Sequence, residues 1–156
     1  MAFRRWYFIL AILLLGFAFA AGAQPLQSFE KSSLVIDTGK GPRTFAVELA
    51  LTPEQEMQGL MYRRSMPADA GMLFDFHDMD TRVFWMKNTF IPLDMVFIAS
   101  DGRVVDIHER AVPLSETNIV SRAPARAVLE LNGGTAARLG IAIGDVVHNP
   151  MFGNGG

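Results

Sequence analysis

The chain has 156 residues, a formal net charge of −2 at pH 7 and no cysteine. This length suits one ordinary domain with a substantial core, and the lack of cysteine excludes disulfides, thiol catalysis and zinc–thiolate sites. A mildly acidic chain does not offer the basic surface that nucleic-acid phosphates require, so we expect no nucleic-acid partner.

The first 23 residues have the pattern of a cleavable signal peptide. Arg4 and Arg5 precede an uncharged, apolar run over residues 6–20, and Ala21-Gly22-Ala23 forms a small-x-small cleavage site. This order is typical of secretory signals. We therefore expect cleavage near the Ala23–Gln24 bond and a periplasmic or secreted protein.

Removal of this segment would change the formal charge from −2 to −4, because its only charged residues are the two arginines. The alternative is that the apolar run is kept as an anchor, since it is close to the lower limit of roughly 17 residues for a membrane span. An uncleaved signal segment is the one membrane contact that we expect.

Residues 24–33 are expected to be a flexible lead-in. Strands at 34–37 and 44–51 are predicted to form a hairpin around the Gly- and Pro-containing turn at 38–42. Thr52-Pro53-Glu54-Gln55 then predicts a helix start with a capping box, and this helix is expected to end near Tyr62.

Four further strands are predicted at 71–76, 82–88, 93–100 and 104–109. Asp101-Gly102 predicts a two-residue type I′ turn between the last two strands. This turn would place three residue pairs opposite each other: Val96 with Ile107, Ile98 with Val105, and Asp94 with Glu109.

The remainder is predicted as a surface loop over 111–124, a strand at 127–131, a helix at 135–139 ended by Gly140, a strand at 146–148 and a loose tail over 150–156. Many short strands with two short helices indicate an α+β fold that is mostly antiparallel β. We expect a compact, barrel-like sheet that forms a single globular domain over residues 34–149.

The best candidate binding site lies around the strand at 93–100. If residues 82–88 pair antiparallel with it, Lys87 lies close to Asp94 and Glu109. The candidate ligand-binding residues are Trp85, Lys87, Asn88 and Asp94. A cation between two carboxylates would shift their pKa values in a partly buried site. Such a cluster is either a functional site or a structural ion-pair network, and the sequence leaves both open.

Acid–base catalysis is the alternative function, with Asp94, Glu109 and Glu130 as candidate catalytic carboxyl groups. Glu130 would serve as a ligand group or as the partner of a neighbouring arginine. The Asn132-Gly133-Gly134-Thr135 segment opens a helix, so its backbone N–H groups would either hold an anion or simply form a turn and a cap.

Copper binding is a weaker alternative, because thioether and imidazole groups suit Cu(I). Its candidates are Met57, Met61, Met95 and His108, although most methionines fill cores. The three histidines lack the spacing of metal ligands, and the sequence contains no phosphate loop or dinucleotide fingerprint. We therefore expect no cofactor and no dedicated metal site.

Several motifs occur in a characteristic order: Gly59-Leu60-Met61, Gly71-Met72-Leu73-Phe74, Phe84-Trp85-Met86-Lys87-Asn88-Thr89, Pro92-Leu93-Asp94, Val128-Leu129-Glu130-Leu131-Asn132-Gly133 and Gly144-Asp145. In this the chain resembles the domain of unknown function 192 family, also called uncharacterised protein family 0127. The resemblance implies a small β-rich domain, often exported, and it carries no activity or catalytic residues. We expect a non-catalytic binding or accessory module of the bacterial cell envelope, whose partner is a small ligand or an envelope protein.

Overall fold

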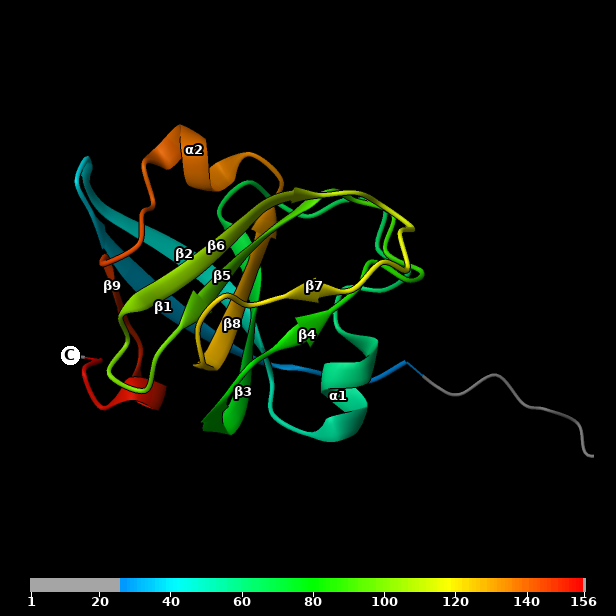
Figure 1. Ribbon diagram of the computed structural model, residues 1–156, viewed down its shortest axis with the longest axis horizontal. Coiled ribbons are helices and arrows are strands. Elements are labelled where there is room, and N and C mark those ends of the chain that lie inside the picture. The colour runs from blue at the N-terminus through cyan, green and yellow to red at the C-terminus, as the bar shows by residue number, and fades with distance from the viewer. Residues whose placement is uncertain (1–25, 156) are drawn as a thin grey trace, which may run out of the picture.

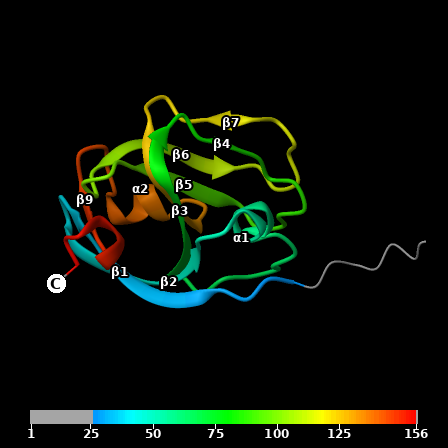
Figure 2. The same cartoon turned by 90° about the horizontal axis from the view of Figure 1, so that it is seen from below.

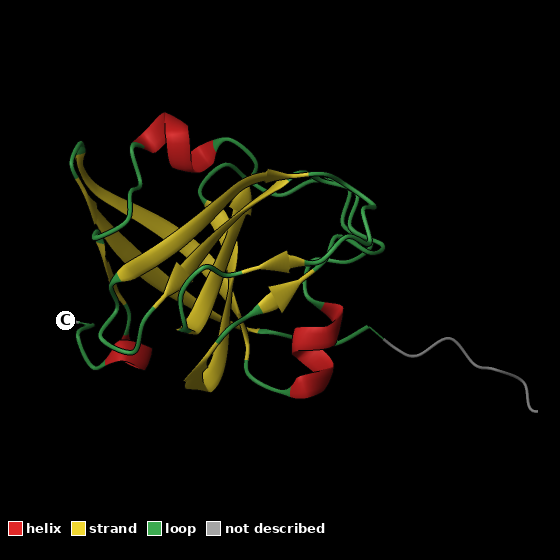
Figure 3. Ribbon diagram, viewed as in Figure 1, coloured by secondary structure: helices red, strands yellow, loops and turns green. Residues whose placement is uncertain are grey.

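The computed structural model describes residues 26–155, so the signal peptide predicted at residues 1–23 lies outside the described part. Strands dominate the fold, and its two α-helices are short (Figure 3). None of the helices described is both long and apolar enough to cross a membrane.

Seven strands form one curled sheet in the order β6-β5-β8-β3-β2-β1-β9 (Figure 1). Its strands are β1 (Glu30–Thr38), β2 (Gly41–Ala50), β3 (Ala70–Asp80), β5 (Leu93–Ile98), β6 (Val104–Ala111), β8 (Ala125–Asn132) and β9 (Val146–His148). Neighbours are antiparallel except for the β2–β3 pair. A parallel pair needs a crossover connection, and helix α1 (Pro53–Gln58) lies in that connection.

The sheet curls into a half-barrel, which confirms the expected mostly antiparallel, barrel-like fold. β1 and β2 lie across the molecule from β5 and β6, and helix α2 (Thr135–Leu139) covers the open end between them (Figures 1 and 2). At one end of the sheet the two edge strands meet: Val147 N–H donates to the Gly102 carbonyl at 2.8 Å, and Val104 N–H donates to the Asp145 carbonyl at 2.8 Å.

Two apolar cores lie on opposite faces of this sheet. The inner core combines residues from strands that face each other across the curl, such as Leu34, Phe45 and Leu129. The outer core covers β3, β8 and β5 with Met72, Phe74, Met95, Phe97 and Val128. Burial on both faces explains why the central strands are nearly continuously apolar in sequence.

A separate two-stranded ribbon lies over the outer core. It consists of β4 (Val83–Phe84) and β7 (Ile119–Val120), which pair antiparallel. The strand predicted at 82–88 is therefore shorter than expected and pairs with the 111–124 segment instead of β5. That segment is predicted as a loop throughout, although Ile119 and Val120 are β-branched residues that favour a strand.

The helix start at Thr52 is confirmed. The Thr52 hydroxyl accepts the Gln55 N–H at 3.3 Å, and Pro53 occupies the first turn. The Gln55 side chain accepts the N–H of Leu51 at 2.9 Å, one residue before the position expected for a capping box. The helix ends at Gln58 instead of near Tyr62, because Gly59 has a positive φ of 47°.

The β5–β6 turn differs from the predicted type I′ hairpin. Gly102 has a φ of 86°, Asp101 has a negative φ, and the Gly102 N–H donates to the Ala99 carbonyl at 3.0 Å. This is a three-residue loop with a bulge at glycine. It pairs Ile98 with Val104 instead of Val105, and a further irregularity restores the predicted Val96–Ile107 pair.

Both predicted flexible ends contain ordered structure. β1 begins at Glu30, inside the predicted lead-in, and pairs with β2 over its whole length. The predicted loose tail contains a 3₁₀ turn at Pro150–Phe152. The side chain of Asn149 accepts the Met151 N–H, and Asn154 Nδ2 donates to the Val147 carbonyl at 3.1 Å.

Gly71→Ala is expected to destabilise the domain by about 1–3 kcal/mol, because the new methyl would overpack the β3–β8 contact. A Cβ at Gly71 would lie 2.7 Å from the Glu130 carbonyl oxygen and 2.9 Å from Leu131 Cδ2. Urea unfolding measures the effect. Gly39→Ala is the matched control, since nothing lies within 4 Å of its Cβ position. Equal stability of the two variants would contradict the prediction.

Candidate functional site

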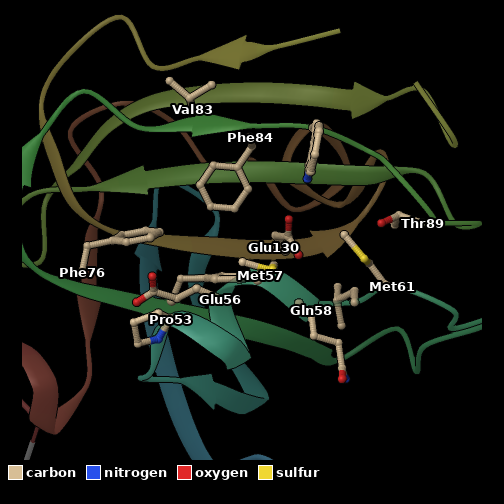
Figure 4. Close-up of a pocket in the computed structure, with 14 residues that line it drawn as sticks. Pro53, Glu56, Met57, Gln58, Met61, Phe76, Val83, Phe84, Thr89 and Glu130 are labelled. Carbon is tan, nitrogen blue, oxygen red and sulfur yellow. The ribbon is translucent and has the colours of Figure 1, made fainter. Parts of the chain in front are cut away.

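A pocket of about 300 Å³ opens between helix α1, the β4 strand and the outer face of the sheet (Figure 4). This volume is at the lower end of the range for small-molecule sites. Its fourteen lining residues are Pro53, Glu56, Met57, Gln58, Gly59, Leu60, Met61, Phe74, Phe76, Val83, Phe84, Trp85, Thr89 and Glu130. Most are apolar or aromatic, and two carry carboxyl groups.

Glu130 forms the floor of this pocket. It lies on β8 between Met72 of β3 and Met95 of β5, both of which are fully buried. The residue is 4 % exposed, and its side chain points into the space between α1 and Phe84 (Figure 4). Among residues 26–155, no group forms a hydrogen bond or an ion pair with its carboxyl. Of the two roles that the sequence leaves open for Glu130, pairing with a neighbouring arginine does not occur within these residues.

Burial raises the pKa of Glu130 from 4.5 to about 8. The physical cause is the loss of water around the charged form, with no nearby cation to compensate for it. At pH 7 the group is mostly a neutral carboxylic acid that can donate a hydrogen bond. A buried group with a perturbed pKa in a cleft is a typical mark of a functional site.

Helix α1 forms one wall of the pocket and supplies the second carboxyl, Glu56. Burial raises the pKa of Glu56, and the charges of His77 and Arg82 oppose that rise. Met57 lies beside Glu56 and is 73 % exposed, so its thioether lies at the pocket mouth. The short helix thus presents one acidic and one thioether group to the same space.

The opposite wall is aromatic. The Phe84 ring makes edge contacts with Phe74, Phe76 and Phe97 at centroid distances of 5.3, 6.1 and 6.3 Å. These contacts hold β4 against the outer core. The next residue, Trp85, is 43 % exposed, and Lys87 Nζ lies 5.0 Å from its ring centroid. Trp85 therefore lies at the solvent-accessible edge of the pocket.

Loops beside the pocket hold three non-glycine residues at positive φ: Tyr62 at 66°, Asn88 at 55° and Leu114 at 63°. Backbone hydrogen bonds join these loops, because the Tyr62 N–H donates to Asn88 and the Leu114 N–H donates to Thr89. Such conformations are unfavourable for bulky side chains and cluster at functional sites. Their concentration here supports the pocket as the candidate site.

The predicted cluster of Lys87, Asp94 and Glu109 does not form. Residues 82–88 do not pair with β5, so the placement of Lys87 next to Asp94 was wrong. Glu109 is exposed on β6, and the β5–β6 register shifts between Leu93 and Met95, so no Asp94–Glu109 pair forms. The described residues contain no ion pair between Lys87 and either carboxylate.

Asp94 is fully buried on the face opposite Glu130. Its Oδ1 accepts the N–H groups of Arg110 and Gly134, and its Oδ2 accepts that of Ala136, all at 2.8 Å. Of the two alternatives for the start of the 135–139 helix, an anion or a turn and a cap, the N–H groups there hold an anionic group of the chain itself, the Asp94 carboxylate. Asp94 ties β5 to β6 and α2, and this explains its burial without a ligand.

The other predicted ligand residues divide between the pocket and its surroundings. Trp85 lines the pocket, whereas Lys87 and Asn88 are half-buried just beyond it. Asn88 Nδ2 donates to the Tyr62 hydroxyl at 3.1 Å, and this hydrogen bond connects the loops that contain these two residues. Glu56, Phe76 and Phe84 also line the pocket and are not among the site residues predicted from the sequence. Glu130 had a usable signal, since it is the single acid in an apolar strand.

The copper candidates are not gathered in one place. Met57 and Met61 line the pocket, whereas Met95 is buried in the outer core and His108 is exposed on β6 outside the pocket lining. Residues 26–155 contain no group of three or more His, Asp or Glu side chains arranged to hold a metal ion.

A curled, mostly antiparallel half-barrel with a carboxyl-floored pocket on its outer face defines a small β-rich single-domain protein. The chain belongs to the DUF192 family, described as "Uncharacterized ACR", which it matches over residues 34–149. This confirms the family resemblance seen in the sequence. No curated protein matches the chain.

The solved structures similar to it include two crystal structures. One is a Sinorhizobium meliloti 1021 protein described as a candidate transcription regulator. It is 50 % identical with a TM-score of 0.78, and the match covers 81 % of this chain and 99 % of that one. The other is a protein of unknown function from Novosphingobium aromaticivorans DSM 12444. It is 40 % identical with a TM-score of 0.77, over 85 % of this chain and 94 % of that one.

Proposed function

We propose that this protein is an exported, non-catalytic binding module of the bacterial cell envelope that takes a small ligand in the pocket at Glu130. The observation that carries the proposal is the carboxyl of Glu130, which opens into a largely apolar pocket. The residue is only 4 % exposed, and no group of residues 26–155 forms a hydrogen bond or an ion pair with its carboxyl. A ligand group in the pocket would provide a partner for it.

The composition of the pocket supports binding. Ligand sites are typically apolar clefts in which a few polar groups fix orientation. Here Phe76, Phe84 and Met57 supply apolar surface, and Glu130 supplies the polar group. The strained loops around Asn88 hold the neighbouring chain in one arrangement, so little ordering would be required when a ligand enters.

Export is proposed from residues 1–23 alone, through the arginine pair, the apolar run and the Ala-Gly-Ala site. An envelope protein is the alternative partner, and the exposed Trp85 and Met57 at the pocket mouth are where it would bind. The description of the Sinorhizobium relative as a regulator is not transferred, because a formal charge of −2 does not favour nucleic-acid binding.

The carboxyl groups that were candidates for acid–base catalysis do not lie in one cleft. It required at least two of Asp94, Glu109 and Glu130 in one cleft. Asp94 lies on the opposite face of the sheet from Glu130, and Glu109 is exposed on β6. Only Glu130 among them lines the pocket. We therefore do not propose a reaction for this trio.

A ligand screen by thermal shift tests the proposal, since a ligand that binds only the folded state raises the melting temperature. A chain that starts at Gln24 retains every described residue and has Trp85 as its sole tryptophan, because the other is Trp6. Each hit is expected both to raise the melting temperature and to change Trp85 fluorescence.

Glu130→Gln should remove most of the shift from these hits, because it replaces the carboxyl at the pocket floor. Glu54→Gln is the control, since Glu54 is exposed on helix α1 and does not line the pocket. Hits that stabilise both variants equally and leave Trp85 fluorescence unchanged would contradict binding at this site.

A further inference from the structure

We infer that the pocket at Glu130 is selective for organic ammonium cations, whose charged group binds beside the carboxyls while the apolar part lies against the aromatic wall. This inference rests on the proposed binding function and adds the ligand class. Three observations support it: the sign of the charges in the pocket lining, the partners of the other buried carboxyl groups, and the aromatic and thioether side chains of the pocket walls.

The first observation is the sign of the charges in the pocket. Among its fourteen lining residues the acidic groups are Glu56 and Glu130, and there is no Lys, Arg or His. An anionic ligand would meet acidic groups without any cationic side chain in the lining to compensate for them. A cationic ligand would meet opposite charge in a site with reduced dielectric, where attraction is stronger than in water.

The second observation is that Glu130 is an exception among buried carboxyl groups. Four such groups are buried in the described chain: Asp75, Asp94, Asp106 and Glu130. Asp75 pairs with Arg126 at 2.9 Å, Asp106 pairs with Arg122, and Asp94 accepts three backbone N–H groups. The chain itself provides a donor or a cation to each of the other three carboxyl groups. Glu130 has no such partner among the described residues, so a donor or a cation of a bound ligand would fit there.

The third observation is the nature of the walls. Aromatic faces attract ammonium groups through their π electrons, and they are the usual recognition surface for such ligands. Two rings of this pocket already lie near cations of the chain, since Arg82 lies 4.4 Å from the Phe76 centroid and Lys87 lies 5.0 Å from that of Trp85, and a ligand would bind to the ring surface that these two side chains leave free. The thioethers of Met57 and Met61 add polarizable surface beside the carboxyls.

Cation binding in this pocket should release a proton. The pKa of Glu130 is about 8 because of burial, so the group is mostly protonated at pH 7, and a cation favours its ionised form. The ionisable group that faces Glu130 across the pocket is Glu56 from α1. β3, β4 and β5 present uncharged residues to it: Phe74 and Phe76, Phe84, and Met95.

The charges near Glu56 are His77, Arg82, Asp75 and Asp78. They lie around the helix side of the pocket and modify Glu56 more than Glu130, for which burial is the sole cause of the raised pKa. The pH dependence of binding above pH 7 should therefore follow Glu130.

Two pairs of probes test the inference by Trp85 fluorescence on the chain that starts at Gln24. Choline is compared with its neutral isostere 3,3-dimethylbutan-1-ol, and phenethylammonium with 2-phenylethanol. Each cation should bind at least tenfold more tightly than its neutral counterpart at pH 9. Choline keeps its charge at every pH, so its affinity should rise about tenfold from pH 7 to pH 9 as Glu130 ionises.

Glu130→Gln should abolish this rise in choline affinity, and the control Glu54→Gln should keep it. Circular dichroism verifies that both variants are folded. Neutral probes that bind as tightly as the cations, or a choline affinity that stays flat with pH, would overturn the cation inference and leave the binding function standing. Failure of both cations to bind overturns it as well. Failure of all four probes together with every compound of the thermal-shift screen would contradict the binding function itself.

Discussion

Glu130→Gln is expected to make the folded domain more stable at alkaline pH by on the order of 5 kcal/mol, and to leave its stability at pH 4 nearly unchanged. The magnitude follows from a pKa of about 8 in the folded state against 4.5 in the unfolded chain, at about 1.4 kcal/mol per pKa unit. A substitution in a candidate site that stabilises the fold is typical of sites that retain an unfavourable group for function.

The sign follows from proton linkage. Between pH 4.5 and about 8 the folded state holds a proton on Glu130 that the unfolded state has lost. The free energy of unfolding therefore falls as the pH rises through this window, and it levels off above the folded pKa. Below pH 4.5 both states are protonated, so the carboxylic acid and the amide of glutamine behave alike.

Urea unfolding of both proteins at several pH values between 4 and 9 measures this effect. Because the pKa of Glu56 is also raised, the free energy of unfolding falls more gently with pH in both proteins. The difference between the two curves therefore isolates Glu130. Parallel curves would mean that Glu130 is solvated or paired in solution, and the argument for the pocket would then fail.

Asp94→Ala is expected to destabilise the domain by about 3–5 kcal/mol. The substitution leaves the N–H groups of Arg110, Gly134 and Ala136 without their acceptor, that of Ala136 in a buried position and the other two in part-buried ones. Each buried donor without a partner costs about 1–3 kcal/mol, and hydrogen bonds to a charged acceptor are at the strong end of that range. The same substitution also removes the connection between β5 and the start of α2.

Chemical denaturation again gives the measurement. Glu109→Gln serves as the control because Glu109 is exposed on the neighbouring strand, and its effect should stay within about 0.5 kcal/mol. At temperatures where Asp94→Ala is still folded, it should bind pocket ligands normally, since it acts on the opposite face of the sheet. A variant with normal stability and lost binding would reverse this assignment.

Asp94 and Glu130 show how two carboxyl groups of similar appearance in the sequence differ in the structure. Both lie in apolar strands, and they are on neighbouring strands, where Asp94 pairs with Leu131 and Met95 pairs with Glu130. A shift of one position places them on opposite faces. On the inner face α2 offers backbone donors to Asp94, whereas on the outer face the walls around Glu130 offer none.

The local sequence determined much of the fold. Turn residues and alternation predicted most strands, Thr52-Pro53 predicted the start of α1, and Gly140 predicted the end of α2. These features depend on backbone preferences and capping within a few residues, so they can be read from the chain alone. The motif order also identified the DUF192 family.

Tertiary structure decided the site. The Lys87–Asp94 cluster depended on residues 82–88 pairing with β5, and this pairing does not form because β4 pairs with β7, a partner more than thirty residues away. The type of turn at Asp101-Gly102 set the register of β6. The pocket joins a helix, a ribbon and a central strand that are distant in sequence, and the pKa of Glu130 depends on what surrounds it from all of them. Burial and the lack of a partner are properties of packing, so no local pattern could have assigned them.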